Sequence, residues 1–173
     1  MRLILILFLM GFAAGCATFA PSTRQPLLVV ITTEGSNNKV ATEMEGETAV
    51  YNIESETGIG GAQVQLQSGE WPPAMILRFH LTGLEEMTLT YGEAATAVTL
   101  NISSHGDNEI HQTVNDAPIS PDDPRWLTVI ITNEDGSSGT IPLENGTIEV
   151  TLPKDFYEVA PTSFHINWID FYR

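Results

Sequence analysis

The chain has 173 residues, which is the size of one domain. Hydrophobic residues make up 42% of the chain and charged residues 17%, so a core can form and general disorder is excluded. The formal net charge of -15 repels nucleic-acid phosphates and anionic lipid headgroups, and we therefore expect no nucleic-acid partner.

The N-terminus has the pattern of an export signal. Arg2 supplies a positive charge, and residues 3–12 form the apolar run LILILFLMGF. A helix needs about 20 apolar residues to span a bilayer, so this run is typical of a signal peptide and not of a membrane anchor. Small residues then lead directly to Cys16, the single cysteine of the chain. A disulfide within the chain is therefore excluded, and the cysteine needs another role.

The segment Ala13-Ala14-Gly15-Cys16 resembles the lipobox of bacterial lipoprotein signal peptides. The resemblance implies cleavage before the cysteine, a lipid on its thiol, and anchoring to a membrane outside the cytoplasm, which is the outer membrane in a Gram-negative cell. An ordinary secretory signal cleaved after Ala17 or Ala20 is the alternative. We therefore predict a lipoprotein signal peptide over residues 1–15 and a lipidated tether over residues 16–26.

From residue 27 onward, apolar and polar residues alternate with a period of two, and no stretch keeps a helical period. The runs that alternate in this way, or are rich in β-branched residues, cover 27–33, 48–53, 62–67, 75–81, 98–103, 127–132, 147–152 and 164–172. Many short strands separated by turn residues predict an all-β fold, an antiparallel, jelly-roll-like β-sandwich of about 8 to 10 strands. We expect residues 27–173 to form this single domain.

Turn residues and polar segments separate these runs. Gly58–Gly61 predicts a turn, and Asn145–Gly146 predicts a tight hairpin because both residue types accept a positive φ. Residues 35–47 and 105–124 are polar and predict long surface loops.

The final run does not keep its apolar residues on one side. Phe164, Ile166 and Trp168 share one face of a strand, whereas Ile169 and Phe171 fall on the other. This pattern predicts either a bulge near Trp168 and Ile169 or burial of both faces.

One segment carries potential metal ligands. His105, Asp107, Glu109 and His111 recur with a period of two, so on a strand they would share a face and offer a divalent metal site. Further carboxylates follow nearby that would suit a structural calcium ion, at Asp116, Asp122 and Asp123. The alternative is a solvated acidic loop. We expect no other cofactor.

Two strands carry polar pairs that would suit a ligand. Arg78 and His80 lie on the polar face of one predicted strand, and His165 and Asn167 on that of the last strand. If the strands are neighbours, the four side chains form a platform for sugar hydroxyls, and Trp126 at a loop edge is a candidate for stacking on the sugar ring. The alternative is that these are ordinary residues of a solvated sheet face and an aromatic that caps the core.

The sequence lacks the motifs of common enzyme classes. It contains no Gly-x-Ser-x-Gly elbow, phosphate-binding loop or Gly-x-Gly-x-x-Gly fingerprint, so we do not expect an enzyme. Residues 58–173, with their many short strands and the closing segment Trp168–Arg173, resemble the galactose-binding-like jelly rolls of carbohydrate-binding modules. The chain also resembles small uncharacterised bacterial lipoproteins. The first resemblance implies a carbohydrate ligand.

The sequence therefore predicts a membrane-anchored extracytoplasmic lipoprotein that acts as a non-catalytic binding module for carbohydrate or another envelope ligand. This function requires a polar and aromatic patch on one sheet face or at the loop ends. The alternative is a structural or assembly lipoprotein that contacts another envelope protein. That function requires an exposed apolar patch instead.

Overall fold

The computed structural model describes residues 29–30, 38–55, 58–66, 70–92, 96–106, 108–141, 143–158 and 163–173. The strands are β1 (Val29–Val30), β2 (Lys39–Glu45), β3 (Thr48–Glu54), β4 (Gly58–Gln65), β5 (Ala74–Tyr91), β6 (Val98–Ser103), β7 (Ile110–Val114), β8 (Ala117–Pro118), β9 (Thr128–Asn133), β10 (Leu143–Leu152) and β11 (Ser163–Tyr172), and the helix is α1 (Lys154–Glu158). The predicted signal peptide, Cys16 and the tether lie outside the described residues and stay predictions.

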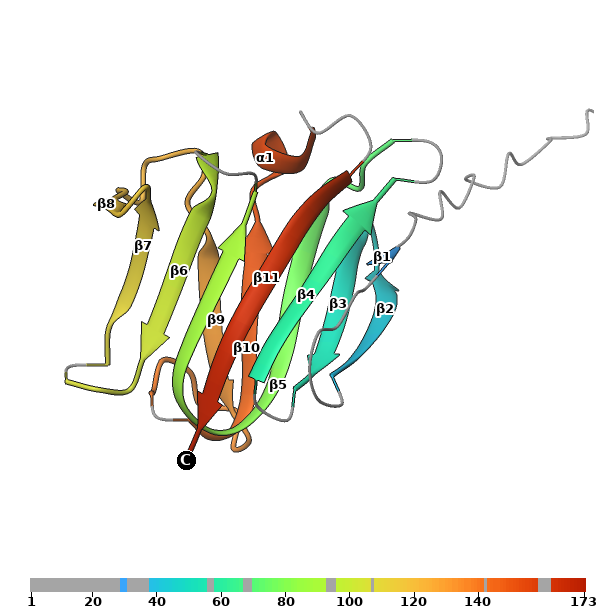
Figure 1. Cartoon of the computed structure of the whole chain (residues 1–173). Helices are drawn as coiled ribbons and strands as arrows, with labels where there is room; N and C mark the ends of the chain where they lie inside the picture. The colour runs from blue at the N-terminus through green and yellow to red at the C-terminus, as the bar shows by residue number, and fades with distance from the viewer. Residues whose placement is uncertain are drawn as a thin grey trace, which may run out of the picture.

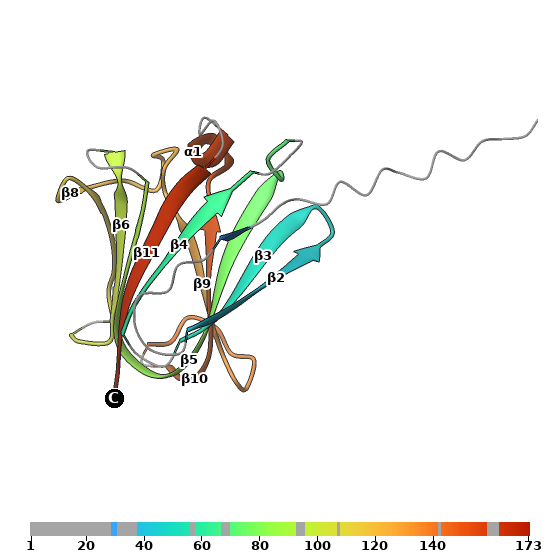
Figure 2. The same ribbon diagram turned by 45° about the vertical axis from the view of Figure 1, so that its right-hand side comes forward.

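The strands form two sheets that share the long strand β5. The first half of β5 pairs with β3 and β10, and its second half pairs with β11 and β6. Between the halves, Gly83 adopts a φ of 61°, which glycine takes at low cost, and the strand curves from one sheet into the other at the lower end of the molecule (Figures 1 and 2). We call β1-β4-β11-β5-β6-β7-β8 the front sheet and β9-β10-β5-β3-β2 the back sheet.

The predicted all-β sandwich is confirmed. The one departure from an antiparallel arrangement among the described strands is the pair β3–β5, which is parallel, so the back sheet is mixed. The described strands number 11, slightly more than expected, and β1 and β8 have two residues each.

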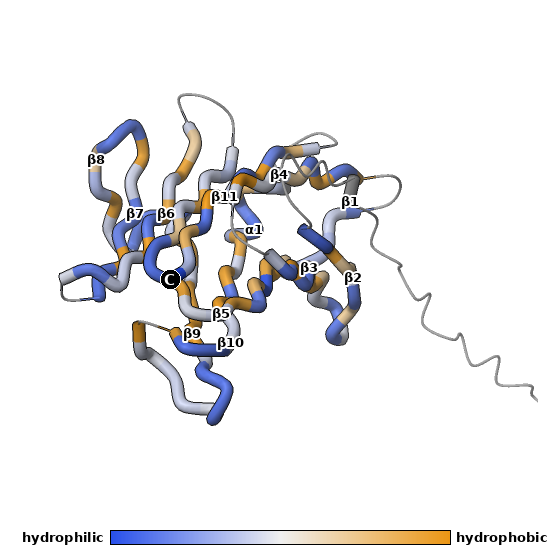
Figure 3. Tube along the Cα trace, turned by 60° about the horizontal axis from the view of Figure 1, so that its bottom comes forward, coloured by the Kyte–Doolittle hydropathy of each residue, from blue (hydrophilic) through white to orange (hydrophobic). Residues whose placement is uncertain are grey.

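The core lies between the two sheets and consists of the residues that point inward, which alternate along the strands with polar ones (Figure 3). Leu77 and Phe79 project into it from the back sheet, and Ile166 and Trp168 from the front sheet. Burying each such side chain contributes about 1.5–3 kcal/mol. The rings of Phe79 and Trp168 meet edge to face with centroids 5.7 Å apart, which joins the two sheets at the centre.

Trp168 also explains the glycines at the start of β4. A Cβ on Gly60 would lie 2.2 Å from the indole, so only glycine fits beneath this ring. The turn predicted over Gly58–Gly61 is therefore wrong, because these residues begin strand β4, in which Gly60 makes room for a core side chain.

The upper end of the core is closed by α1. Its Phe156 and Tyr157 pack against Tyr91, Trp71 and Phe164, with Phe156 and Tyr91 ring centroids 4.2 Å apart. The buried hydroxyl of Tyr157 donates to the carbonyl of Pro72 at 2.8 Å, and that of Tyr91 to the carbonyl of Arg125 at 2.7 Å. Burial raises the pKa of Tyr91. The helix thus covers this end of the core and contributes two aromatic rings to it.

Several predicted loops and turns are strands instead. β2 lies within the expected loop 35–47, and β7 and β8 lie within the expected loop 105–124. The predicted hairpin at Asn145–Gly146 is also wrong, because both residues are in β10 and pair with β9 or β5. A Cβ on Gly146 would lie 2.1 Å from the carbonyl oxygen of Thr132, so the glycine permits close approach of β9 and does not make a turn.

The last strand keeps a regular alternation through residue 170, unlike either predicted option. Trp168 and Asp170 point into the core while Ile169 and Phe171 point to solvent, and the register shifts only between Phe171 and Tyr172. An apolar pair is therefore exposed and a carboxylate is buried on the same strand.

Candidate binding face

The predicted four-residue platform is divided between opposite faces of the sandwich. β5 and β11 are neighbours, but β11 pairs with the second half of β5, from Leu84 to Tyr91. Arg78 and His80 belong to the first half, in the back sheet, whereas His165 and Asn167 lie in the front sheet. The platform is therefore not formed, because the core separates its two halves.

Arg78 is held by three glutamates on the outer side of the back sheet. Its Nε donates to Glu149 at 2.7 Å, and its Nη1 donates to Glu45 at 2.9 Å and Glu43 at 3.2 Å. The hydrogen bonds that Arg78 donates to Glu45 and Glu149 raise its pKa, and its side chain is 18% exposed. The guanidinium thus ties β5 to β2 and β10, and few of its donors remain for a ligand.

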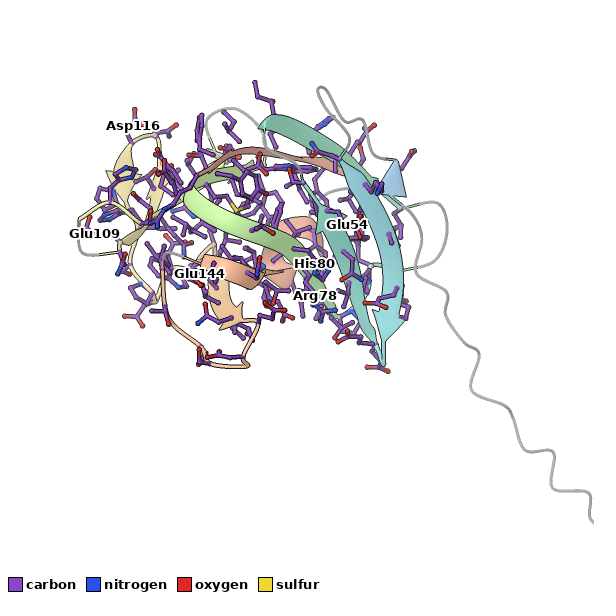
Figure 4. All side chains as sticks on the ribbon, turned by 90° about the horizontal axis from the view of Figure 1, so that it is seen from below. Glu54, Arg78, His80, Glu109, Asp116 and Glu144 are labelled. Carbon is purple, nitrogen blue, oxygen red and sulfur yellow. The ribbon has the colours of Figure 1, made fainter. Side chains whose placement is uncertain are left out.

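His80 belongs to the same network. Its Nε2 lies 3.2 Å from Oδ1 of Asn52, whose amide nitrogen donates to Glu43. Since that amide oxygen is an acceptor, the ring nitrogen is the donor of the pair. We define the back face as the outer surface formed by Lys39, Glu43, Glu45, Asn52, Glu54, Arg78, His80 and Glu149. Figure 4 shows Arg78, His80 and Glu54 gathered there.

The predicted metal ligands do not converge in the described part of the chain. Nε2 of His111 pairs with Glu109 at 2.5 Å, whereas Nδ1 of His105 lies 3.4 Å from the hydroxyl of Ser103. Asp107 lies outside the described residues. No group of three or more His, Cys, Asp or Glu side chains placed to hold a metal ion occurs among the residues described.

The carboxylates suggested for calcium are also dispersed. Asp116 and Asp122 are exposed, and Asp123 accepts from Nε of Arg125 at 2.9 Å and from its Nη2 at 2.7 Å. These hydrogen bonds lower the pKa of Asp123 to about 2. Trp126, the predicted stacking residue, follows this pair in the loop before β9. It is half-buried and belongs to no strand of either sheet.

The outer surface of the front sheet has a different composition. One row across its strands is formed by Gly61, Asn167, Thr90 and Thr99, and the row below it by Ile59, Ile169, Thr88 and Asn101. Gln63 and His165 form a pair above these rows, and Phe171 extends β11 below them. We call these residues the front face. The two central rows contain no Asp, Glu, Lys or Arg.

The front face exposes a contiguous apolar strip, formed by Ile59, Ile169 and Phe171. Ile59 and Ile169 are directly opposite each other on β4 and β11. These three side chains are 58%, 38% and 53% exposed, respectively. The sequence already contained the signal, because an alternation continued without a bulge places both Ile169 and Phe171 outside.

The same alternation buries Asp170, a residue that the sequence analysis did not select. It is 2% exposed, and its Oδ2 accepts from the hydroxyl of Tyr172 at 3.0 Å. That hydroxyl also lies 3.1 Å from the carbonyl of Ser55, and burial raises the pKa of Tyr172. Oδ1 of Asp170 has no hydrogen-bond partner among the described residues.

The core contains a cavity of about 10 Å³ between the sheets, against Val64, Ile166 and Trp168. It has the size of a single water molecule and is too small for a larger ligand. No helix in the described part of the chain has both the length and the apolar character needed to cross a membrane.

Comparison with known proteins gave no match: no family model fits the sequence, and neither a characterised relative nor a similar solved structure was found. Function must therefore be argued from the chemistry of the two faces.

Proposed function

We propose that this protein is a membrane-anchored extracytoplasmic lipoprotein whose domain is a non-catalytic binding module, and that the front face is its binding surface. The observation that carries the proposal is the register of β11, which turns Ile169 and Phe171 to solvent while it buries Asp170. Soluble proteins expose contiguous apolar groups mainly where another molecule covers them.

The hydrogen-bonding groups of the front face support the same choice. His165 and Asn167 are exposed and make no side-chain hydrogen bond within the described part of the chain. By contrast, Arg78 and His80 on the back face are already engaged by neighbouring side chains. A ligand therefore meets unused donors and acceptors on the front face, but it must displace existing ion pairs on the back face.

The anchoring part of the proposal is supported by the sequence alone, through the lipobox-like Ala13-Ala14-Gly15-Cys16. Mass spectrometry of the full chain from its own host tests it. We expect a mature N-terminal Cys16 that carries acyl chains. A mature protein that retains Met1, or one with an unmodified thiol, would contradict the proposal.

The binding surface is tested in the cell with a photo-cross-linking amino acid. The probe replaces Phe171 on the front face or, as the matched control, Ile130 on the outer side of the back sheet, which is 48% exposed. We expect a discrete adduct from position 171 and none from position 130. Equal adducts from both positions, or none from either, would contradict binding through the front face.

A carbohydrate is the second candidate ligand, and one observation favours it. Phe171 shares its face with the uncharged groups Asn167, Thr90 and Asn101, a combination that suits a sugar ring and its hydroxyls. A glycan array probed with the purified protein, beside its Phe171→Ala variant, tests this function. Specific binding that the variant loses would support it, and absence of binding to any glycan would contradict it.

A further inference from the structure

The apolar strip has the composition of a protein contact more than of a sugar site. Two of its three residues, Ile59 and Ile169, are aliphatic, whereas stacking on a sugar ring requires aromatic planes. Centres of protein interfaces are instead apolar and depleted of charge, with polar groups around them. The two rows of the front face that lack Asp, Glu, Lys and Arg fit this description.

The lower margin of the front face is acidic. Glu86 lies directly opposite Phe171 on the adjacent strand and is exposed. Its chain neighbour Glu85 lies 3.7 Å from Arg173, and Glu109 is exposed at the near end of β7. Of the three carboxylates at this margin, Glu109 is paired with His111 and Glu85 lies near Arg173, whereas Glu86 is exposed beside the strip. A partner with Lys or Arg beside its apolar anchor is therefore complementary in charge to Glu86.

The same charges disfavour two other occupants. A second copy of this chain would bring another formal charge of -15 to the interface and place like charges beside the strip. An anionic membrane surface would repel the acidic margin. Both remain observable outcomes of the experiment below.

We propose that the front face docks a partner protein that presents an apolar anchor to Ile59, Ile169 and Phe171 and a basic group to Glu86. This inference rests on the proposed function, since it names the class of ligand that the front face takes. The apolar strip supplies the buried centre of the contact, and Glu86 sets its orientation and its rate of formation.

The test uses the full chain in its own host with the photo-cross-linking amino acid at position 171 or position 59. Each is combined with Glu86→Lys or, as the control, with Glu54→Lys on the back face, where the side chain of Glu54 is 65% exposed. Both substitutions change the net charge equally. We expect the same protein to be cross-linked from both positions, with a yield lowered about tenfold by Glu86→Lys and unchanged by Glu54→Lys.

Association of this chain with the purified partner gives the second measurement. We expect the association rate to fall as salt is raised and to fall about tenfold with Glu86→Lys, because opposite charges at an interface steer the encounter. Circular dichroism of each variant must show the unaltered β spectrum, so that loss of binding is not loss of fold.

The outcomes separate this inference from the function on which it rests. A glycan or lipid adduct, an adduct with twice the mass of the chain, or a partner whose yield is indifferent to Glu86→Lys would overturn the basic protein partner and leave the front face as the binding surface. Absence of any adduct from positions 171 and 59 would overturn both.

Discussion

The back face and the front face are built from the same kind of strand, and β5 contributes to both, yet they treat polar groups in opposite ways. On the back face, Arg78 is surrounded by Glu43, Glu45 and Glu149, so the charges satisfy one another. On the front face, exposed Asn167 lies beside an apolar strip and makes no side-chain hydrogen bond within the described residues.

The difference teaches where to look for function on a solvated sheet. A charged cluster attracts attention in a sequence, but once its groups pair with each other it fastens strands together and offers little to a ligand. A face with few charges looks unremarkable in a sequence. It becomes a candidate binding surface when the structure shows that its apolar side chains are exposed among the described residues.

The largest expected effect tests the two sides of β11. We expect Trp168→Ala to lower the free energy of unfolding by about 3–5 kcal/mol, because it empties a packed site in the core. Phe171→Ala on the same strand should change it by no more than about 0.5 kcal/mol, because the ring is exposed. Urea denaturation followed by circular dichroism measures both. A similar cost for the two variants would mean that the register of β11 is wrong.

The second prediction concerns the buried layer that separates the faces. Burial, with a smaller contribution from Tyr157, raises the pKa of Tyr51 to about 12. Because the folded pKa lies above the unfolded value, the stability that comes from a neutral phenol is complete below about pH 10 and is lost as the pH rises towards 12. This stability is on the order of 2–3 kcal/mol. Phenolate absorbance and circular dichroism measured together between pH 9 and 12.5 should show ionisation of Tyr51 coupled to unfolding.

The matched variant for this prediction is Tyr51→Phe, which keeps the ring and removes the ionisable hydroxyl. The free energy of unfolding of this variant should fall less steeply than that of the unaltered protein as the pH rises from about 10 towards 12. The burial of Tyr91 and Tyr172 also raises the pKa of each, so some pH dependence will remain. An unchanged slope in the variant would show that Tyr51 does not contribute.

The third prediction compares a polar residue from each face. We expect Arg78→Met to lower the free energy of unfolding by about 1–2 kcal/mol, because three carboxylates are left close together without a cation. Added salt should make this loss smaller, since it screens the repulsion between the carboxylates. Asn167→Ala on the front face should cost no more than about 0.5 kcal/mol. The measurement is denaturation at low and high salt. If both substitutions lower the free energy of unfolding by the same amount, the polar side chains of the back face do not stabilise the fold more than those of the front face.

The smallest expected effect lies outside both faces, in the loop before β9. Hydrogen bonds from Arg125 lower the pKa of Asp123 to about 2. Because the folded pKa is depressed, the stability from this pair is present above about pH 4 and is lost as the pH falls towards 2. The melting temperature of Asp123→Asn should therefore depend less on pH across this range than that of the unaltered protein. Identical profiles would show that the pair contributes nothing.

Alternation along the chain was sufficient to predict the strands that have one buried face. The runs 75–81 and 147–152 correspond to parts of β5 and β10, and the run 62–67 overlaps β4 as far as Gln65. The sequence did not predict β2 as a strand, because all of its residues except Val40 are exposed and it therefore carries no alternation of buried and exposed residues. The turn predicted at the glycines of β4 was wrong because Gly60 is required by a ring from a distant strand, the indole of Trp168, which packs directly on it.

The candidate site shows the same division. The sequence identified His165 and Asn167 as polar residues on a solvated face, and the structure places them there. It did not identify Ile59, Ile169 or Phe171, since an apolar residue in a strand is more often buried than exposed.

The amino-acid sequence by itself determined the all-β character and the alternate sides of each strand, because side-chain direction in a strand is a local property with a period of two. Only the tertiary structure decided which residues share a surface. The bend at Gly83 sends the two halves of β5 into different sheets, and this separates Arg78 and His80 from β11. Pairing of β11 with β4 and β5 fixed its register, and the fixed register put Asp170 inside and Phe171 outside.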